Sequence, residues 1–169
     1  QRALTERQTK SEGVGSNNMS NKSAVHLLMT DYKIDSRVRN ETNSLAGFGY
    51  EVLVCCLSGE GQPKIARREP VDIHRFGSGR SRLPQYITAY ISMFIYLLRK
   101  KIDIVHAHDL TALPIAVLIS KFKRIPLVYD SHELWSQSHH GDHPSWAIKV
   151  MEVFEKLFGG QSDAVITVS

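Results

Sequence analysis

The sequence contains little cysteine and no long apolar segment. Among its 169 residues the only cysteines are Cys55 and Cys56. Neighbouring residues of a strand point to opposite faces of a sheet, so these two are not expected to form a disulfide with each other. A disulfide-stapled secreted domain is therefore excluded, and a cytoplasmic location is expected. No signal peptide is recognised, and no apolar run approaches the roughly 20 residues that cross a bilayer.

Several motifs that identify enzyme classes are also missing. The sequence has no G-x-G-x-x-G after a strand, no P-loop G-x-x-x-x-G-K-[ST] and no nucleophile elbow G-x-S-x-G. Their absence argues against a dinucleotide fingerprint, a P-loop protein and an elbow-type hydrolase. The motif H-E-x-x-H is absent too, and the histidines at 139–143 fall in an expected loop without the rigid support that metal ligands need. No metal and no cofactor are expected; a metal-dependent hydrolase is kept as an alternative.

The overall charge is mildly basic. The formal net charge is +4, with 42% hydrophobic and 22% charged residues, which is ordinary for a globular domain. A basic excess favours anionic partners such as a phosphorylated ligand or an acidic lipid, but ordinary solubility charge explains it equally well. Nothing in the composition indicates a nucleic-acid partner.

The first 22 residues differ from the rest of the chain in composition and in hydrophobic pattern. Residues 1–22 are polar, rich in Ser, Asn and Gly, and show no sustained period. This composition predicts a disordered segment. Met19 is a candidate natural start, and the residues before it are either native or an expression remnant. The folded domain is expected to occupy residues 23–169.

Beyond residue 22, strand patterns alternate with helical patterns. Apolar or β-rich runs predict strands at 24–30, 50–57, 71–76, 102–107, 125–130 and 163–169. Helical spacing predicts helices at 36–50, 84–101, 111–123 and 145–158. Ser36 is the expected N-cap of the first helix and Gly49 its stop, and Pro114 is expected in the first turn of the third. Alternating strands and helices predict an α/β fold with a Rossmann-like, doubly wound, mostly parallel sheet ordered 3-2-1-4-5-6.

Ligands bind such sheets outside the carboxyl ends of the strands, and here those ends are polar. The polar residues that follow the first, fourth and fifth strands are Asp31, Asp35, Ser36, Arg37, His108, Asp109, Ser131, His132 and Glu133. His106 is still within its strand and is interpreted as a buried imidazole bonded to backbone. His108 lies further out and is interpreted as functional. Asp109 either caps the next helix or belongs to the site.

The helix at 84–101 carries more apolar residues than one face needs. Its expected core stripe is Ile87, Tyr90, Ile91, Phe94, Ile95 and Leu98. Further apolar residues lie beside this stripe, and Arg99, Lys100 and Lys101 form an expected cationic last turn. Such a helix can make peripheral contact with the cytoplasmic face of an anionic membrane. The alternative, which is favoured over membrane contact, is that a neighbouring domain or a dimer partner covers the apolar surface of this helix.

Four segments together carry a family resemblance. They read DSRVRNETNSLAGFGYEVLV, DIVHAHDLTALPIAVLIS, IPLVYDSHELW and DAVITVS. Over residues 24–169 the chain resembles the N-terminal domain of GT-B glycosyltransferases of the group 1, or family four, type. The resemblance implies a second Rossmann-like domain that holds a nucleotide-sugar donor, while this domain binds a glycan or lipid-linked acceptor. It also implies transfer with retention of anomeric configuration and without a catalytic metal.

The resemblance further implies roles for the polar strand ends. His108 matches the histidine that reaches the donor sugar or the transition-state region. The loop at 31–37 would lie near donor phosphates or acceptor, with Arg37 suited to hold a phosphate. The loop at 131–133 would help to line the acceptor pocket. Asp109, if it is not the helix cap, is expected to bind substrate.

Two features depart from the family pattern. The first loop reads DYKIDSR where many relatives carry a Gly-Gly pair, and the sequence has no Glu-x7-Glu motif. That motif belongs to the donor domain. The chain is therefore expected to be an N-terminal part of a longer enzyme and inactive alone. A non-catalytic Rossmann-like binding or assembly module is the alternative.

Overall fold

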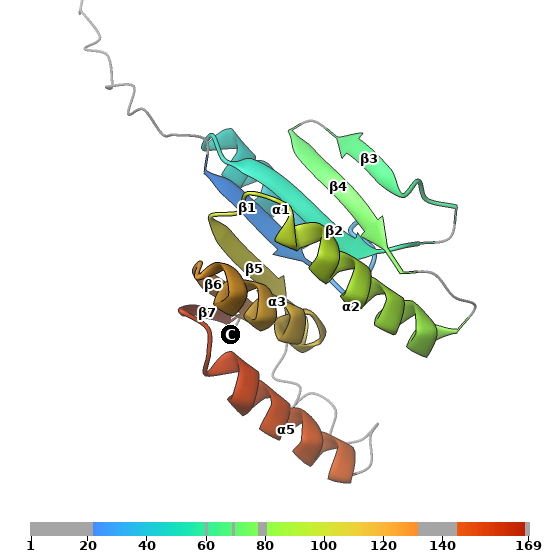
Figure 1. Cartoon of the computed structure of the whole chain (residues 1–169), viewed down its shortest axis with the longest axis vertical. Helices are drawn as coiled ribbons and strands as arrows, with labels where there is room; N and C mark the ends of the chain where they lie inside the picture. The colour runs from blue at the N-terminus through green and yellow to red at the C-terminus, as the bar shows by residue number, and fades with distance from the viewer. Residues whose placement is uncertain (1–21, 60, 69, 78–80, 132–144, 168–169) are drawn as a thin grey trace, which may run out of the picture.

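The computed structural model describes residues 22–59, 61–68, 70–77, 81–131 and 145–167 (Figure 1). Within them, seven strands form one sheet in the order β3-β4-β2-β1-β5-β6-β7. Neighbouring strands are parallel except β3 and β4, which are antiparallel. The strands are β1 (Ser23–Leu27), β2 (Glu51–Leu57), β3 (Ile65–Arg68), β4 (Val71–Phe76), β5 (Ile104–His108), β6 (Leu127–Ser131) and β7 (Ala164–Thr167).

Helices cover both faces of this sheet. In the described residues they are α1 (Ser36–Gly47), α2 (Arg82–Leu98), α3 (Asp109–Lys123) and α5 (Ser145–Gly159). Helices α2, α3 and α5 lie on the face toward the viewer in Figure 1, where Met93 and Ile115 share a core with sheet residues such as Leu127. Helix α1 lies on the other face, where Val38 packs in a second core with Val54.

The strand order confirms the Rossmann-like, doubly wound prediction. The six predicted strands correspond, in chain order, to β1, β2, β4, β5, β6 and β7. Their observed order, β4-β2-β1-β5-β6-β7, is the predicted order 3-2-1-4-5-6, and β1 and β5 meet at its centre. Strand β3 was not predicted. It has four residues and depends on antiparallel pairing with the edge of β4, a long-range contact that leaves little signal in the local sequence.

The prediction that Ser36 caps α1 was wrong. Asp35 is the N-cap, and its side chain accepts hydrogen bonds from the backbone N–H groups of Arg37 and Val38 at 3.0 and 3.1 Å. Both residues are good N-caps, so the local pattern did not separate them. Gly49 follows the helix with φ +89°, a left-handed conformation that suits the expected stop.

The start of α3 also differs from the expectation. The helix begins at Asp109, directly after β5, and His108 rather than Asp109 is the N-cap. Asp109 has φ +66°, which is uncommon for a residue with a side chain. Pro114 therefore lies beyond the first turn, contrary to the prediction.

The predicted core stripe of α2 was right for Tyr90, Phe94 and Leu98, which pack against the core, and wrong for its three isoleucines. The buried residues of the helix are Ala89, Met93 and Leu97, whereas Ile87, Ile91 and Ile95 of the predicted stripe are exposed. The helix carries two apolar rows, and periodicity alone does not say which of them meets the sheet. The helix ends at Leu98, so the cations follow the last turn instead of forming it.

Two smaller expectations concern cysteine and membranes. Cys55 and Cys56 are both buried and free, as predicted. Among the described residues, the search for a helix with the length and hydropathy of a membrane span found none.

Candidate functional site

The ends of β1, β5 and β6 meet at one edge of the sheet. Strand β5 lies between the other two, with Ala107 paired to Leu27 of β1 and His108 paired to Asp130 of β6. From this edge the chain leaves β1 toward Asp35 and α1, and it leaves β5 directly into α3. We call this region, residues 28–37, 108–111 and 130–131, the carboxyl edge. His108 and Asp35 thus follow strands that end on the same side, as predicted.

Three imidazoles lie together just inside the carboxyl edge. His26, His106 and His108 are buried and occupy the face that α1 covers. Nδ1 of His26 lies 2.9 Å from Nε2 of His108, and the rings of His106 and His108 stack with centroids 4.4 Å apart. Two carboxylates complete the group. Asp130 Oδ2 lies 3.5 Å from Nδ1 of His108, and Glu41 Oε1 of α1 lies 2.7 Å from Nδ1 of His106.

The contacts of His108 define its tautomer. Burial lowers the pKa of His26 and of His108; the neighbouring imidazoles lower both further, while the contact with Asp130 partly offsets the effect at His108. Both rings are therefore neutral at neutral pH, with one donor and one acceptor nitrogen each. Nδ1 of His108 faces Oδ2 of Asp130 at 3.5 Å, so the tautomer with its proton on Nδ1 suits this contact. Nε2 of His108 then accepts from Nδ1 of His26, which fixes the ring from both sides.

His108 belongs to the carboxyl edge, but its side chain is buried inside the domain rather than exposed on the surface. Its side chain is 1% exposed. Because its Nε2 atom is paired with His26, direct contact with a sugar requires that bond to be exchanged. His106 is buried within its strand as predicted, but its partner is Glu41 and not the backbone.

His26 and Glu41 were not predicted as part of the site. His26 lies inside an apolar strand and Glu41 lies within a helix, so only the pairing of β1 with β5 and the packing of α1 place them here. Together with His106 and His108 they offer ligand atoms within 4.8 Å of one another, a donor set that zinc accepts. The Nδ1 atoms of His26 and His106 form the two pairs described above, whereas the Nε2 atoms of both rings have no hydrogen-bond partner among the described residues.

Acidic residues fix the loop after β1. Asp31 lies 3.7 Å from the buried Arg75 of β4 and accepts a hydrogen bond from the N–H of Lys33. Asp35 is engaged in capping α1. Ser36 and Arg37 are exposed in the first turn of α1. Of the four residues predicted here, these two present the most accessible side chains, and Arg37 supplies a cation at the carboxyl edge.

Two of the remaining predicted residues, Asp109 and Ser131, lie on the other face of the sheet. Asp109 lies near Tyr129 of β6 on this face. Burial raises the pKa of Tyr129 to about 12, and the charges of Glu155 and Asp109 raise it further. Ser131 Oγ lies 3.5 Å from Oε1 of Glu155 on α5. Asp109 and Ser131 therefore border the edge on the side of α3 and α5, opposite the imidazoles. His132 and Glu133 lie outside the described residues.

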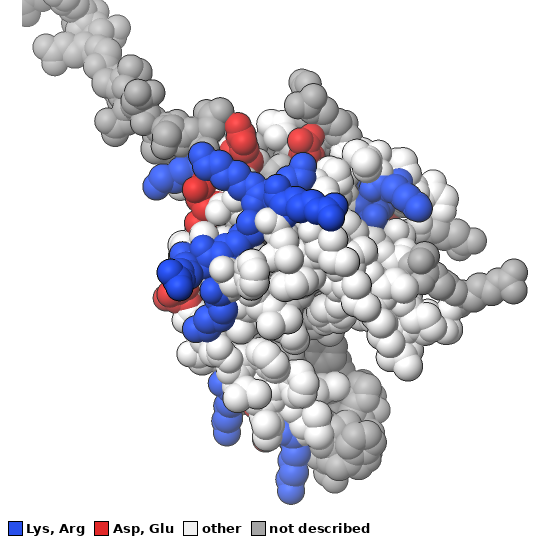
Figure 2. Space-filling view, in the orientation of Figure 1, with Lys and Arg blue, Asp and Glu red and all other residues white. Residues whose placement is uncertain are grey.

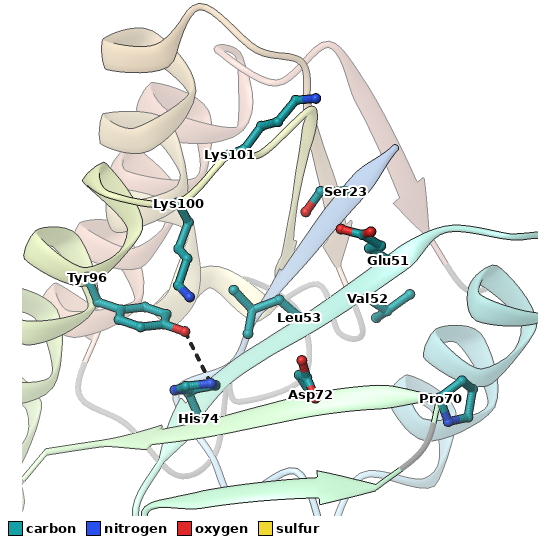
Figure 3. A pocket seen from close by; sticks show the side chains of 10 residues that line it. All are labelled: Ser23, Glu51, Val52, Leu53, Pro70, Asp72, His74, Tyr96, Lys100 and Lys101. Atoms are coloured by element: carbon teal, nitrogen blue, oxygen red, sulfur yellow. Dashed lines mark hydrogen bonds between the residues drawn. The ribbon is translucent and has the colours of Figure 1, made fainter. Parts of the chain in front are cut away.

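A pocket of about 690 Å³ opens at the opposite end of the sheet (Figure 3). It is lined by residues at the start of β1, β2 and β4 and at the end of α2. Within it, the hydroxyl oxygen of Tyr96 lies 3.1 Å from Nε2 of His74, and the Nζ atom of Lys100 lies 4.9 Å from the centroid of the Tyr96 ring. Ligands of open parallel sheets bind at the carboxyl ends of the strands, so we do not assign the site to this pocket.

The mostly parallel sheet, with β1 and β5 at its central switch point, defines a Rossmann-like domain. Solved structures share this fold. Two chains of sucrose-phosphate synthase from Thermosynechococcus elongatus match with TM-scores of 0.66 and 0.63 at 13% and 15% identity. The matches cover 86% and 88% of this chain, and 76% and 43% of those chains.

A third similar structure is UDP-GlcNAc 2-epimerase from Methanocaldococcus jannaschii. Its TM-score is 0.53 at 15% identity, and the match covers 87% of this chain and 39% of the epimerase. Identities this low show the fold alone. The chain thus spans less than half of the epimerase chain and of one sucrose-phosphate synthase chain.

The family follows from the sequence itself. The model of Glycosyltransferase Family 4 matches residues 34–169, and the chain belongs to this family. With the sucrose-phosphate synthase fold, this match confirms the N-terminal domain of a GT-B glycosyltransferase. No curated protein sequence gives a significant match.

Proposed function

We propose that this domain is the acceptor-binding half of a retaining glycosyltransferase, which transfers a sugar from a nucleotide-sugar donor to a glycan or lipid-linked acceptor in the cytoplasm. The observation that supports this most is the carboxyl edge in a chain of this family. There His108 ends β5, Asp130 lies near the end of the adjacent β6, and the exposed Arg37 lies beyond the end of β1 on the other side.

The charged and polar side chains at the carboxyl edge are suited to the chemistry of glycosyl transfer. During transfer, the bond from the anomeric carbon to a phosphate oxygen breaks, and the acceptor oxygen forms the new bond while its proton passes to the departing phosphate. Positive charge builds on the sugar and negative charge on the phosphate. Arg37 is suited to the phosphate. The carboxylates and imidazole at the edge are suited to orienting hydroxyl groups and holding the acceptor.

We propose that the reaction needs no catalytic metal. The side chains of the group around His108 form two pairs with one another, His26 with His108 and His106 with Glu41. The two pairs stabilise the neutral imidazoles without an ion. In this scheme His26 acts as a positioning residue, because it fixes the tautomer of His108 without touching the substrate.

The architecture is tested by reading the gene beyond the codon for Ser169. A second α/β domain with a Glu-x7-Glu motif is expected there or in a partner subunit. A stop codon near Ser169 with no such subunit would favour the alternative, a non-catalytic binding or assembly module.

Activity is tested on the longer protein with a panel of nucleotide sugars in the presence of EDTA. We expect transfer with retention of configuration, unaffected by EDTA, and a loss of about a hundredfold or more in His108→Asn. His74→Asn is the matched control, since His74 lies at the opposite end of the sheet. Full activity of His108→Asn, or loss with EDTA, would contradict the proposed roles.

A further inference from the structure

Helix α2 exposes a row of large apolar side chains along its outer surface. Leu83, Ile87, Ile91 and Ile95 recur every four residues and are exposed by 71%, 50%, 58% and 47%. Side chains at this spacing form one stripe on a helix. The stripe lies opposite the row that packs on the sheet, so the fold of this domain does not use it.

Helix α3 extends this surface. Leu118 and Phe122 are 58% and 70% exposed. Phe122 meets Phe94 of α2 edge to face with ring centroids 6.3 Å apart, and Lys123 Nζ donates to the carbonyl oxygens of Leu98 and Lys100. The two helices therefore present one continuous surface. We call its apolar part, Leu83, Ile87, Ile91, Ile95, Leu118 and Phe122, the apolar ridge.

Cations border the apolar ridge, and carboxylates are missing from both helices beyond Asp109. The sequence has no Asp or Glu at 82–101 or at 110–124. Figure 2 views the molecule from this side: uncharged residues cover most of α2 and α3, and Lys and Arg side chains gather toward one end. The exposed cations where the two helices end are Arg99, Lys101, Lys121 and Arg124, whereas the ammonium of Lys100 turns toward Tyr96 in the pocket (Figure 3).

We propose that the apolar ridge and these cations dock on the surface of an anionic lipid bilayer. Apolar side chains would enter the boundary between headgroups and acyl chains while the cations contact lipid phosphates. A second copy of the chain is a poorer occupant. A two-fold interface would bury the same cationic surface against itself, with no carboxylate on the ridge helices beyond Asp109 to pair with the cations.

The ridge begins at the carboxyl edge. The first turns of α2 are tied to the ends of β1 and β2, since Tyr86 donates to the carbonyl of Met29 and Gln85 to that of Ser58. Leu83 and Ile87 thus lie next to the edge, and the cations lie at the far end of α2. A docked domain would hold the edge close to the bilayer. The consequence that the acceptor is lipid-linked rests on the proposed function, whereas membrane docking does not.

Cosedimentation of the chain with vesicles tests the docking directly. We expect binding to vesicles of phosphatidylglycerol and phosphatidylcholine at least tenfold stronger than to phosphatidylcholine alone, decreasing with added salt. Soluble glycerol phosphate should not compete, because it offers the phosphate without the bilayer. Competition by it would identify an ordinary anion site and overturn the proposal.

Two variants and one control assign the surface. Ile91→Asn combined with Ile95→Asn should weaken vesicle binding about tenfold or more, and Lys121→Glu combined with Arg124→Glu should remove the preference for anionic lipid. Ile65→Asn is the control, because Ile65 is 66% exposed on β3 at the far edge of the sheet. Far-ultraviolet circular dichroism checks that each variant folds. Binding equal to the control, or a dimer that the Ile variants dissociate without any vesicle binding, would overturn the proposal. Neither result depends on a glycosyl-transfer assay.

Discussion

The imidazoles behind the carboxyl edge are held neutral by their surroundings. Burial disfavours the charged form of His26 and His108, and each ring would also repel its protonated neighbours. The same arrangement leaves His108 with one tautomer, because Asp130 accepts its Nδ1–H and His26 donates to its Nε2. These contacts are therefore stable at neutral pH, and protonation of the imidazoles in acid would break them.

The free energy of unfolding should therefore fall as the pH decreases from about 7 to about 5. The folded-state pKa of both histidines lies below their usual 6.5, so below that pH the unfolded chain binds protons that the folded chain excludes. The stability is fully present above the unfolded pKa and decreases as the pH drops, by up to about 1.4 kcal/mol per pH unit for each histidine. Urea unfolding at several pH values measures this slope.

The variant His26→Gln provides the comparison. It removes one titrating ring, so its slope between pH 5 and 7 should be clearly shallower than that of the wild type. An unchanged slope would mean that His26 is not held neutral by burial, and the derivation of the His108 tautomer would fail with it.

The sequence predicted some site residues well and missed others. His108 was predicted because a polar residue at a strand end stands out against an apolar strand. His26 was missed because it lies in the middle of β1, and its role depends on pairing with β5 across 82 residues of sequence. Glu41 was missed because a carboxylate on a helix surface is ordinary until α1 is placed on the sheet.

At the scale of elements, the first turn of α1 shapes the loop that follows β1. Asp35 accepts two backbone N–H groups that the helix itself leaves unpaired. The cap fixes where α1 begins, and thereby where Arg37 and Glu41 lie.

Asp35→Ala should destabilise the domain by about 1 kcal/mol, because the cap is lost, while Asp35→Ser should recover most of it. Ser36→Ala should change the free energy of unfolding by less than about 0.5 kcal/mol, since Ser36 is exposed and is not the cap. Chemical denaturation of the three variants checks both values. The reverse ranking of Asp35→Ala and Ser36→Ala would reinstate Ser36 as the cap.

Helix α2 shows where periodicity stops being informative. Every predicted helix exists, but the row of α2 that packs on the sheet was misassigned because both rows are apolar. The buried row is Ala89, Met93 and Leu97, and periodicity does not rank a row that contains a small residue above a row of isoleucines. Strand β3 was missed for a related reason: an edge strand of four residues is defined by its partner.

At the scale of the whole molecule, the order of the strands could be predicted from the sequence. Which face of the sheet each predicted site residue points to could not. Alternating strands and helices, with right-handed crossovers, leave few arrangements for a chain of this length. The division of the predicted residues between the α1 face and the α3 face follows from alternation along β5 and β6. Asp130 points toward His108, and Ser131 points toward Glu155.

The central claim is that sugar and phosphate groups bind at the carboxyl edge. The most direct measurement is a titration of the ¹⁵N-labelled chain with glucose 1-phosphate, followed by amide chemical shifts. Binding at the carboxyl edge should shift the amide signals of Asp35–Val38, His108–Leu110 and Ser131 and leave those of Glu51, Asp72 and Lys100 at the opposite pocket unchanged. Shifts confined to that pocket, or none at the carboxyl edge, would contradict it.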